Sequence, residues 1–293
     1  MLWPKSLSKE IKTNVSLANY TSFKIGGQAE YFFEPKNLKG LQEALVFSRQ
    51  IGQPVFILGS GSNILISQGH LAGLVIRLAN KEFKKFSCCG NTILAGSGLK
   101  LNTLIAFSKK KHLSGLEFLV GIPGTLGGCL AGNAGAWGKS IGDLVKQVAV
   151  LDYYGRLKIL TTKQLKFGYR KSNLSKYIII WAKLKLQTRP GKLISERLNE
   201  FILRRKQSQG IYLPNAGCIF KNPALASAGK LIDGCNLKGK SFGKAVISKR
   251  HANFILNAGN AKSQDVLRLM NLMQKKVKEK FKINLEPEIK IWK

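Results

Sequence analysis

Two glycine-rich, uncharged segments constrain the fold of this chain more than any other feature. The first, GSGSN at 59–63, follows the apolar run PVFIL at 54–58, and the second occupies 121–138. An apolar run that leads into glycines is typical of a strand followed by a loop. Glycine also lets another group approach the backbone closely. We interpret both segments as loops pressed against a ligand, and we expect 121–138 to pack against another part of the chain.

Neither segment is a standard nucleotide-binding motif. Gly59, Gly61 and the following residues lack the third glycine of a dinucleotide fingerprint, because Ile64 occupies that position; no strand–helix–strand pattern follows. Gly138-Lys139-Ser140 is not a phosphate loop, because Asn133 stands where that motif needs glycine. Successive backbone N–H groups in such loops can still bind phosphate. Tight turns between strands are the alternative that the residues alone leave open.

The rest of the chain mixes helical and strand patterns. We expect helices at about 100–112, 192–209 and 263–281, the last with one apolar face formed by Val266, Met270, Met273, Val277 and Phe281. Strands are expected at 54–58, 72–78 and 93–96, in succession over 145–190, and in the final LEPEIKIW. A length of 293 residues is typical of two or three domains. These patterns predict an α+β protein with three regions.

The charge is strongly positive. The chain has 48 Lys and Arg against 15 Asp and Glu, a formal net charge of +33. The lysines are spread along the chain, and no zinc-finger, basic-zipper or aromatic RNA-binding pattern accompanies them, so we expect no nucleic-acid partner. A general lysine bias is the simplest interpretation, and an anionic substrate would gain from the positive field.

Cysteine and histidine give no metal pattern. Cys88, Cys89, Cys129, Cys218 and Cys235 form no C-x-x-C pair, and the three histidines share no metal spacing, so no metal site is expected. The first residues lack an apolar leader, and the longest apolar run, 177–182, is too short to span a membrane. We therefore expect a soluble, cytoplasmic protein with no membrane partner.

Eight segments, taken in order, resemble one enzyme family. They are YTSFKIGG (20–27), ILGSGSNIL (57–65), GLEFLVGIPGTLGG (115–128), GNAGAWG (132–138), FGYRKS (167–172), NAGCIFKNP (215–223), KGKSFGKAVISKRHANFILN (238–257) and LEPEI (285–289). Together they resemble the UDP-N-acetylenolpyruvoylglucosamine reductases (UDP-N-acetylmuramate dehydrogenases). The short interval between Arg170 and Asn215 resembles the subgroup that lacks an extra substrate-covering loop.

The resemblance implies an α+β flavoprotein with a two-part FAD-binding module of the vanillyl-alcohol-oxidase type and a C-terminal substrate-binding domain. The implied regions are 1–70, joined by the C-terminal strand 285–293, then 71–190, and then 200–284. It also implies noncovalent FAD, NADPH as co-substrate, and reduction of UDP-N-acetylglucosamine enolpyruvate to UDP-N-acetylmuramate in peptidoglycan precursor synthesis. A monomer is expected. A different flavoenzyme on the same fold, such as an oxidase that uses oxygen, is the competing hypothesis.

Three catalytic residues follow from the resemblance. Arg170 matches the arginine that stabilises charge on the reacting carboxylate, a task that suits a two-pronged guanidinium. Glu288, which directly precedes the β-branched residue of LEPEI, is preferred over Glu286 as the catalytic glutamate. Cys218 stands where the family usually has a proton-donating serine. A thiol is the stronger acid and can do the same work, while a small buried filler is the alternative.

The resemblance also implies binding residues. Lys206 and Asn222 are expected to contact the sugar nucleotide. For Lys221 and His251 two roles stay open, a contact with the substrate or the positioning of strands alone. The residues expected to contact FAD are Gly59, Ser60, Gly61, Ser62, Asn63, Gly121, Ile122, Pro123, Gly124, Thr125, Gly127, Gly128 and Asn133.

Overall fold

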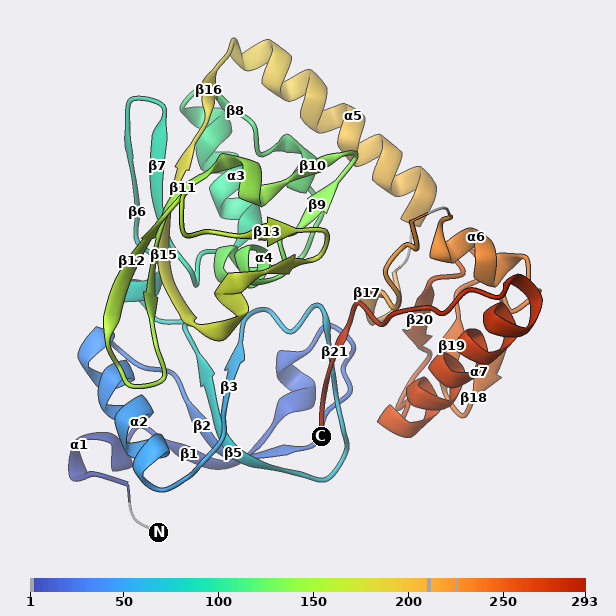
Figure 1. The fold of residues 1–293 in the computed structure, drawn as a ribbon, viewed down its shortest axis with the longest axis horizontal. Coiled ribbons are helices and arrows are strands. Elements are labelled where there is room, and N and C mark those ends of the chain that lie inside the picture. The colour runs from blue at the N-terminus through green and yellow to red at the C-terminus, as the bar shows by residue number, and fades with distance from the viewer. Residues whose placement is uncertain (1–2, 210–211, 225) are drawn as a thin grey trace. The chain divides into compact units, whose positions relative to one another are not determined.

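A computed structural model describes residues 3–209, 212–224 and 226–293. The fold is α+β, as predicted (Figure 1). The chain divides into two compact units. Unit 1 contains the residues up to Thr13, Glu30–Gly59 and Ala72–Arg204, whereas unit 2 contains Asn14–Ala29, Ser60–Leu71 and the described residues of Arg205–Lys293.

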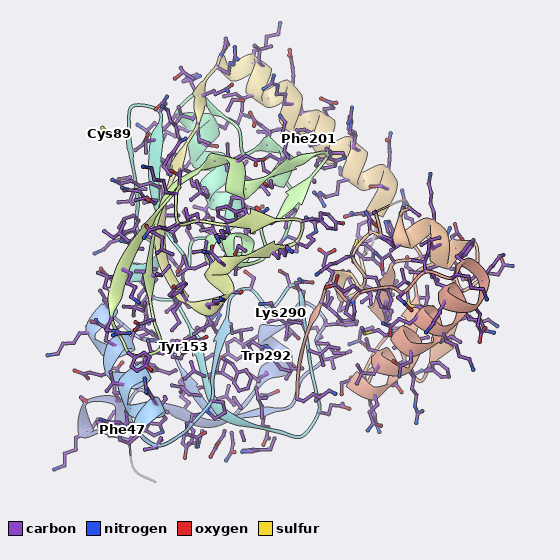
Figure 2. All side chains as sticks on the ribbon, in the orientation of Figure 1. Phe47, Cys89, Tyr153, Phe201, Lys290 and Trp292 are labelled. Atoms are coloured by element: carbon purple, nitrogen blue, oxygen red, sulfur yellow. The ribbon has the colours of Figure 1, made fainter. Side chains whose placement is uncertain are left out.

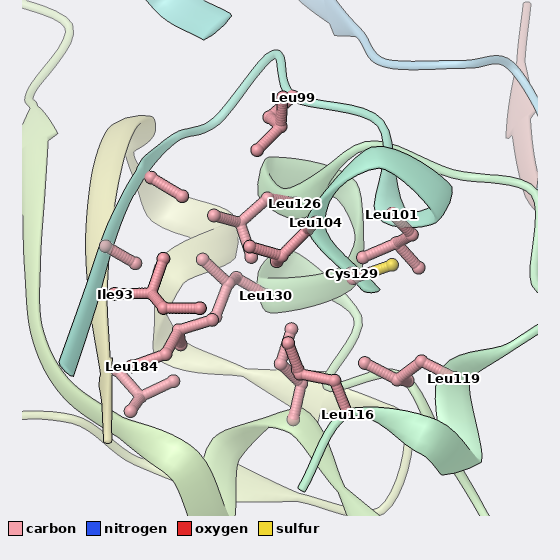
Figure 3. Packing of buried hydrophobic residues seen from close by; sticks show 14 of the residues in the cluster. Ile93, Leu99, Leu101, Leu104, Leu116, Leu119, Leu126, Cys129, Leu130 and Leu184 are labelled. Carbon is pink, nitrogen blue, oxygen red and sulfur yellow. The ribbon is translucent and has the colours of Figure 1, made fainter. Parts of the chain in front are cut away.

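A five-stranded antiparallel sheet forms the centre of unit 1. Its order is β12 (Leu157–Thr161), β11 (Val145–Leu151), β15 (Ile178–Lys185), β7 (Thr92–Gly96) and β6 (Phe86–Cys89). Helix α4 (Leu126–Ala131) packs on β7 and β15. Figure 3 shows the apolar core of this layer, where Leu126 and Leu130 of α4 meet Leu104 of α3 (Leu101–Lys110) and Ile93 of β7.

A second apolar cluster in unit 1 surrounds α2 (Leu38–Gln50). It includes Phe33, Leu41 and Leu74, all fully buried. The adjoining four-stranded sheet has the order β1 (Lys12–Ser16), β2 (Gln28–Phe33), β5 (His70–Arg77) and β3 (Val55–Leu58), in which β3 and β5 are parallel. The other elements of unit 1 are α1 (Lys5–Ser8), β8 (Leu113–Ser114), β9 (Gly135–Ala136), β10 (Lys139–Ser140), β13 (Phe167–Gly168), β14 (Lys171–Ser172), β16 (Gln187–Thr188) and most of α5 (Gly191–Gln209).

Unit 2 is built on a four-stranded antiparallel sheet. Its order is β17 (Asn215–Cys218), β20 (Phe254–Asn257), β19 (Ala245–Ile247) and β18 (Ser241–Phe242). Helix α7 (Ser263–Phe281) packs on β18, on β19 and on α6 (Ala228–Asp233). A separate parallel pair joins β21 (Lys290–Trp292) to β4 (Ile64–Ile66), and the N–H of Ser67 donates to the carbonyl of Trp292. Lys290 and Trp292 mark this last strand in Figure 2.

The expected helices and the other expected strands are present, but only Lys290–Trp292 of the expected final strand LEPEIKIW is regular strand. Two further differences are informative. Helix α7 spans the predicted residues, and Val266, Met270, Met273 and Val277 are buried, but Phe281 at its end is 36% exposed. The glycine-rich segment 121–138, interpreted as loop, contains α4. The Thr125 hydroxyl caps this helix by accepting from the N–H of Gly128, and burial of Leu126 and Leu130 offsets the low helix propensity of its glycines. No helix among the described residues is long and apolar enough to cross a membrane.

Candidate functional site

The loop 59–63 holds backbone groups ready for a ligand. Gly61 has φ +62°, and a Cβ built on it would lie 2.1 Å from the carbonyl oxygen of Tyr20, so only glycine fits there. The N–H of Ser22 donates to the Gly61 carbonyl at 3.0 Å and fixes the loop. Within the described residues, the N–H groups of Ser60 and Gly61 have no acceptor. Such adjacent donors suit an anion like a phosphate.

The loop 121–125 in unit 1 has the same character. It is tied down by hydrogen bonds from Leu101 N–H to the Gly124 carbonyl and from Leu126 N–H to the Leu99 carbonyl. The N–H groups of Gly124 and Thr125 have no acceptor in the described part of the chain. A Cβ on Gly59 would lie 2.9 Å from the Thr125 hydroxyl oxygen, so the end of β3 and this loop approach closely. The predicted loop ligands thus offer free backbone donors.

Ser97 is a candidate that the sequence interpretation missed. It follows β7, is buried, and its hydroxyl has no hydrogen-bond partner among the described residues. The N–H of Gly127 donates to the Ser97 carbonyl at 2.8 Å, so this serine lies against the predicted cofactor loop. A buried hydroxyl without a partner costs free energy, and a bound polar group would remove that cost. The only sequence signal was its position between two glycines, Gly96 and Gly98.

Arg170 lies in the two-residue turn between β13 and β14. Its φ is +54°, a left-handed conformation that costs a non-glycine residue free energy and that the turn must hold in place. Its guanidinium donates to the Gly135 carbonyl at 2.7 Å. The Asn133 amide braces the same region, donating to the Gly168 carbonyl and accepting from the N–H of Gly142. The turn therefore presents a half-buried arginine with a fixed orientation.

The segment 132–138 does pack against another element, as predicted. The Trp137 ring stacks on the ring of Phe201 in α5, with centroids 4.6 Å apart and planes inclined by 23°. Phe201 is labelled in Figure 2. The hydrogen bond from Arg170 to Gly135 joins this braced segment to the β13–β14 turn.

Cys218 and Glu288 come together in unit 2, although 69 residues separate them in the sequence. Cys218 ends β17, and the next residue, Ile219, accepts at its carbonyl the N–H of Glu288 at 2.8 Å. The predicted loop residue Asn63 also contacts Glu288, since its side-chain amide donates to the Glu288 carbonyl at 3.2 Å. Its own carbonyl accepts from Lys290 N–H. Hydrogen bonds thus connect Glu288 with the predicted cofactor residue Asn63 and with Ile219, the neighbour of Cys218 in the chain.

Glu286 and Lys221 pair with each other beside this network. Their side chains form an ion pair, and the N–H of Lys221 donates to the Glu286 carbonyl at 2.9 Å. The carboxylate of Glu286 is exposed, with a side-chain accessibility of 71%. The exposure of Glu286 agrees with its interpretation as a surface acid.

The predicted substrate residues also lie in unit 2. Asn222 accepts from the N–H of Ala228 at the start of α6. Arg250 donates to the carbonyl of Lys206 at 2.9 Å, which ties the last turns of α5 to the segment preceding β20. His251 accepts from the N–H of Asn253, and burial lowers the pKa of its imidazole, which favours the neutral form at pH 7.

The other cysteines have no place in these networks. Burial raises the pKa of Cys129 to about 12, so its thiol stays protonated at neutral pH. Cys88 and Cys89 lie on the edge strand β6, where Cys89 is labelled in Figure 2. A cavity of about 530 Å³ in unit 1, lined by Glu117, Lys139, Asp143 and Arg197 among others, contains none of the predicted site residues. The backbone donors and hydrogen-bonded networks, rather than this cavity, mark the candidate site.

Two known protein families match this chain, and together the matches cover most of its length. Residues 207–292 match the C-terminal domain of UDP-N-acetylenolpyruvoylglucosamine reductase. Residues 29–161 match an FAD binding domain.

Relatives match over nearly the whole length. The UDP-N-acetylenolpyruvoylglucosamine reductase of Clostridium tetani is 38% identical over 286 residues, which cover 97% of this chain and 92% of that protein. The crystal structure of UDP-N-acetylenolpyruvylglucosamine reductase (MurB) from Thermus caldophilus has a TM-score of 0.83 at 36% identity, covering 97% of this chain and 98% of that one. The structure of Phl p 4.0202, a glucose dehydrogenase, has a TM-score of 0.51 at 16% identity over 62% of this chain and 42% of its own. That last likeness concerns the fold alone.

Proposed function

Because this chain belongs to the family of UDP-N-acetylenolpyruvoylglucosamine reductases, we propose that it reduces UDP-N-acetylglucosamine enolpyruvate to UDP-N-acetylmuramate with NADPH. The proposal places the reaction in peptidoglycan precursor synthesis in the cytoplasm. The observation that carries it is the pair of hydrogen bonds in unit 2 that connects Glu288 with Asn63 and with Ile219, the residue after Cys218. A proton donor, a carboxylic acid and a cofactor-loop residue are the parts that such a reduction requires.

FAD, bound without a covalent link, is the proposed cofactor, supported by the match to an FAD binding domain. The residues present in each unit fit it. In unit 1, Gly124 and Thr125 offer backbone donors and Ser97 offers a hydroxyl, and in unit 2, Ser60 and Gly61 offer backbone donors, groups of the kind that bind phosphate. When bound, FAD would supply the hydride chemistry that connects NADPH with the terminal vinyl carbon of the enolpyruvyl ether. The protein supplies binding, orientation and the proton.

Arg170 is proposed to stabilise the charge that forms on the substrate. Hydride addition at the terminal carbon leaves negative charge on the carbon beside the carboxylate, which spreads into that carboxylate as an enolate. A guanidinium held by the Gly135 carbonyl keeps a fixed direction and can grip two carboxylate oxygens. Removing one such preorganised donor from an enzyme site costs about 3–4 kcal/mol in the transition state.

Cys218 is proposed to complete the reduction by giving its thiol proton to the enolate carbon. The C–H bond that forms uses the enolate electron pair, and the thiolate left behind regains a proton from solvent. Glu288 donates its N–H to the carbonyl of Ile219, the residue after Cys218, and accepts at its own carbonyl from the Asn63 amide. It is proposed to share the enolate charge as a hydrogen-bond donor in its protonated form. The overall reaction then consumes NADPH and one proton for each sugar reduced.

Lys206 and Asn222 are proposed to bind the sugar nucleotide. The cationic Lys206 and the hydrogen-bonding amide of Asn222 suit a diphosphate and its sugar hydroxyls. The formal net charge of +33 favours the approach of both anionic substrates.

An anaerobic experiment tests this function. Purified protein loaded with FAD should lose its flavin absorbance when NADPH is added, and UDP-N-acetylglucosamine enolpyruvate should restore it. Failure of the sugar to restore the absorbance would overturn the proposal. Bleaching by a simple alcohol or sugar instead of NADPH would favour an oxidase or dehydrogenase of the kind whose fold is similar.

A further inference from the structure

Phe220 has an unusual position between two segments of unit 2. On one side it is opposite Pro287, and its neighbours make the hydrogen bonds there: Glu288 N–H to Ile219 and Lys221 N–H to Glu286. This pattern turns the N–H and carbonyl of Phe220 itself to the other side. Strand β17 has already ended at Cys218, so no regular ladder continues there to receive them.

One side chain satisfies both groups. The Asn253 amide oxygen accepts from the N–H of Phe220 at 2.9 Å, and the amide nitrogen donates to the carbonyl of Phe220 at 2.8 Å. Both residues are 1% exposed, so water cannot replace these bonds. The amide thus acts as a short piece of strand that extends the pairing past Cys218.

Asn253 is itself held in place on both sides. Its N–H donates to His251, and its carbonyl accepts from the N–H of Ile219 at 2.9 Å. Asn253 therefore contacts the two residues that follow Cys218 with three hydrogen bonds. The opposite edge of the same two residues carries Glu288. The distance from the Cys218 thiol to the Glu288 carboxyl depends on this segment being held straight between them.

We propose that Asn253 is a positioning residue, which holds the segment 219–220 so that Cys218 and Glu288 stand in register for protonation of the substrate. This inference rests on the proposed function. It requires that Asn253 act on the sugar half-reaction through Cys218, and leave the NADPH half-reaction alone.

Asn253→Asp tests the inference, because the carboxylate keeps the shape and one acceptor but faces the Phe220 carbonyl without a donor. In stopped-flow measurements, flavin reduction by NADPH should stay within about twofold of native, and flavin reoxidation by the enolpyruvyl sugar should slow at least about tenfold. In a Cys218→Ala background the same change should slow the residual sugar reaction by no more than about twofold. If the double variant instead slows by the product of the two single-variant reductions, Asn253 does not act through Cys218 and the inference is overturned.

Asn257→Asp is the matched control. Asn257, the last residue of β20, is also a buried asparagine, but its amide bonds to the Phe23 carbonyl and to the N–H groups of Gly259 and Ala261. In urea unfolding, the Asn257→Asp variant should lose about as much free energy of unfolding as Asn253→Asp. Both of its half-reactions should keep their native rates. A sugar half-reaction slowed as much in Asn257→Asp would reduce Asn253 to a general folding role. If Asn253→Asp does not fold, Asn253→Ser repeats the test with a smaller neutral group.

The outcomes separate the inference from the function on which it rests. If Cys218→Ala alone keeps native sugar reduction, the proposed proton donor fails. If Cys218→Ala stops the sugar half-reaction and Asn253→Asp leaves it unchanged, only the role of Asn253 fails.

Discussion

At the scale of single residues, the position of Cys218 distinguishes this chain from the usual pattern of the family it resembles. The family usually has a serine there, and this chain has a thiol at the end of β17, next to the residue that binds the Glu288 N–H. A thiol without charged neighbours has a pKa of about 8.5, whereas an alcohol stays protonated throughout the pH range in which proteins are assayed. The exchange therefore predicts a different pH dependence for the same proton transfer.

Substitution of Cys218 tests the proton donor. Cys218→Ala should leave flavin reduction by NADPH intact and nearly stop sugar reduction, because no group remains to protonate the enolate. Cys218→Ser should keep appreciable activity and lose the alkaline decline of the native pH profile. Near-native turnover of Cys218→Ala would exclude Cys218 as the donor. Alkylation of the native thiol, slowed by bound substrate, gives an independent measurement.

Replacement of Arg170 separates charge from geometry. Arg170→Lys keeps the positive charge but loses the two parallel hydrogen bonds and the contact with the Gly135 carbonyl. Sugar reduction should fall by about a hundredfold or more, while NADPH reduction of the flavin stays near native. An unchanged second half-reaction would remove Arg170 from the mechanism. The same stopped-flow assay measures both rates.

At the scale of elements, two turns are shaped by groups that the strand pattern alone does not reveal. The loop after β3 needs Gly61, since the Tyr20 carbonyl leaves no space for a side chain. The turn between β11 and β12 is organised by Asp152, whose carboxylate accepts from the N–H groups of Tyr154 and Arg156. One turn is proposed to serve the cofactor and the other serves folding.

Gly61→Ala should impair flavin retention. The added Cβ would displace the loop whose Ser60 and Gly61 N–H groups are proposed to bind the FAD diphosphate. Gly52→Ala is the control, because Gly52 has a similar φ of +66° but nothing within 4 Å of its Cβ position. The two variants share the backbone cost of about 1 kcal/mol. Flavin absorbance after gel filtration should drop only in Gly61→Ala; equal retention would remove this loop from the cofactor site.

Asp152→Asn should destabilise unit 1 in a pH-dependent way. Burial alone would raise the pKa of the Asp152 carboxyl, but hydrogen bonds from Arg156, Lys158 and Tyr154 outweigh it and hold this pKa well below its usual range. A depressed folded pKa adds stability above the unfolded value of about 4, and this stability is lost as the pH falls through the folded value.

Urea unfolding measures the effect of Asp152→Asn. The variant should be less stable than the native protein by about 1 kcal/mol at pH 7, and the difference should shrink toward pH 2. Asp143→Asn is a control outside this turn, because the Asp143 carboxylate accepts from the Ser140 N–H in the capping box of a short helix. A difference for Asp152→Asn that does not depend on pH would contradict the assignment of its charge.

At the scale of the whole molecule, the sequence makes predictions about regions, oligomeric state and net charge. The predicted regions 1–70, 71–190 and 200–284 stay a prediction. The two compact units divide the chain differently, since residues of 1–70 belong to both of them. The pairing of β21 with β4 links the end of the chain to residues 64–66. A monomer remains the expected state, and gel filtration with light scattering measures it.

The net charge of +33 should give only weak, salt-sensitive binding to DNA. Contacts between lysines and phosphates weaken as the salt concentration rises. Binding releases counterions from the DNA, and this release is less favourable at high salt. Retention on a DNA column should therefore vanish by moderate salt. Sequence-specific binding that survives such salt would reveal a second function. The reductase proposal would still be decided by the anaerobic flavin experiment.

Local features of the chain were determined by the sequence alone. The 3.6-residue spacing of Val266, Met270, Met273 and Val277 predicted α7, and apolar runs ending in glycine predicted β3 and its loop, because these signals depend on neighbours along the chain. The tertiary structure decided what lies far apart in sequence. It brought Glu288 to Cys218, paired Asn253 with Phe220, and made a helix of Leu126–Ala131 against β7 and β15. Those arrangements depend on burial and on hydrogen bonds between distant segments, which no local pattern records.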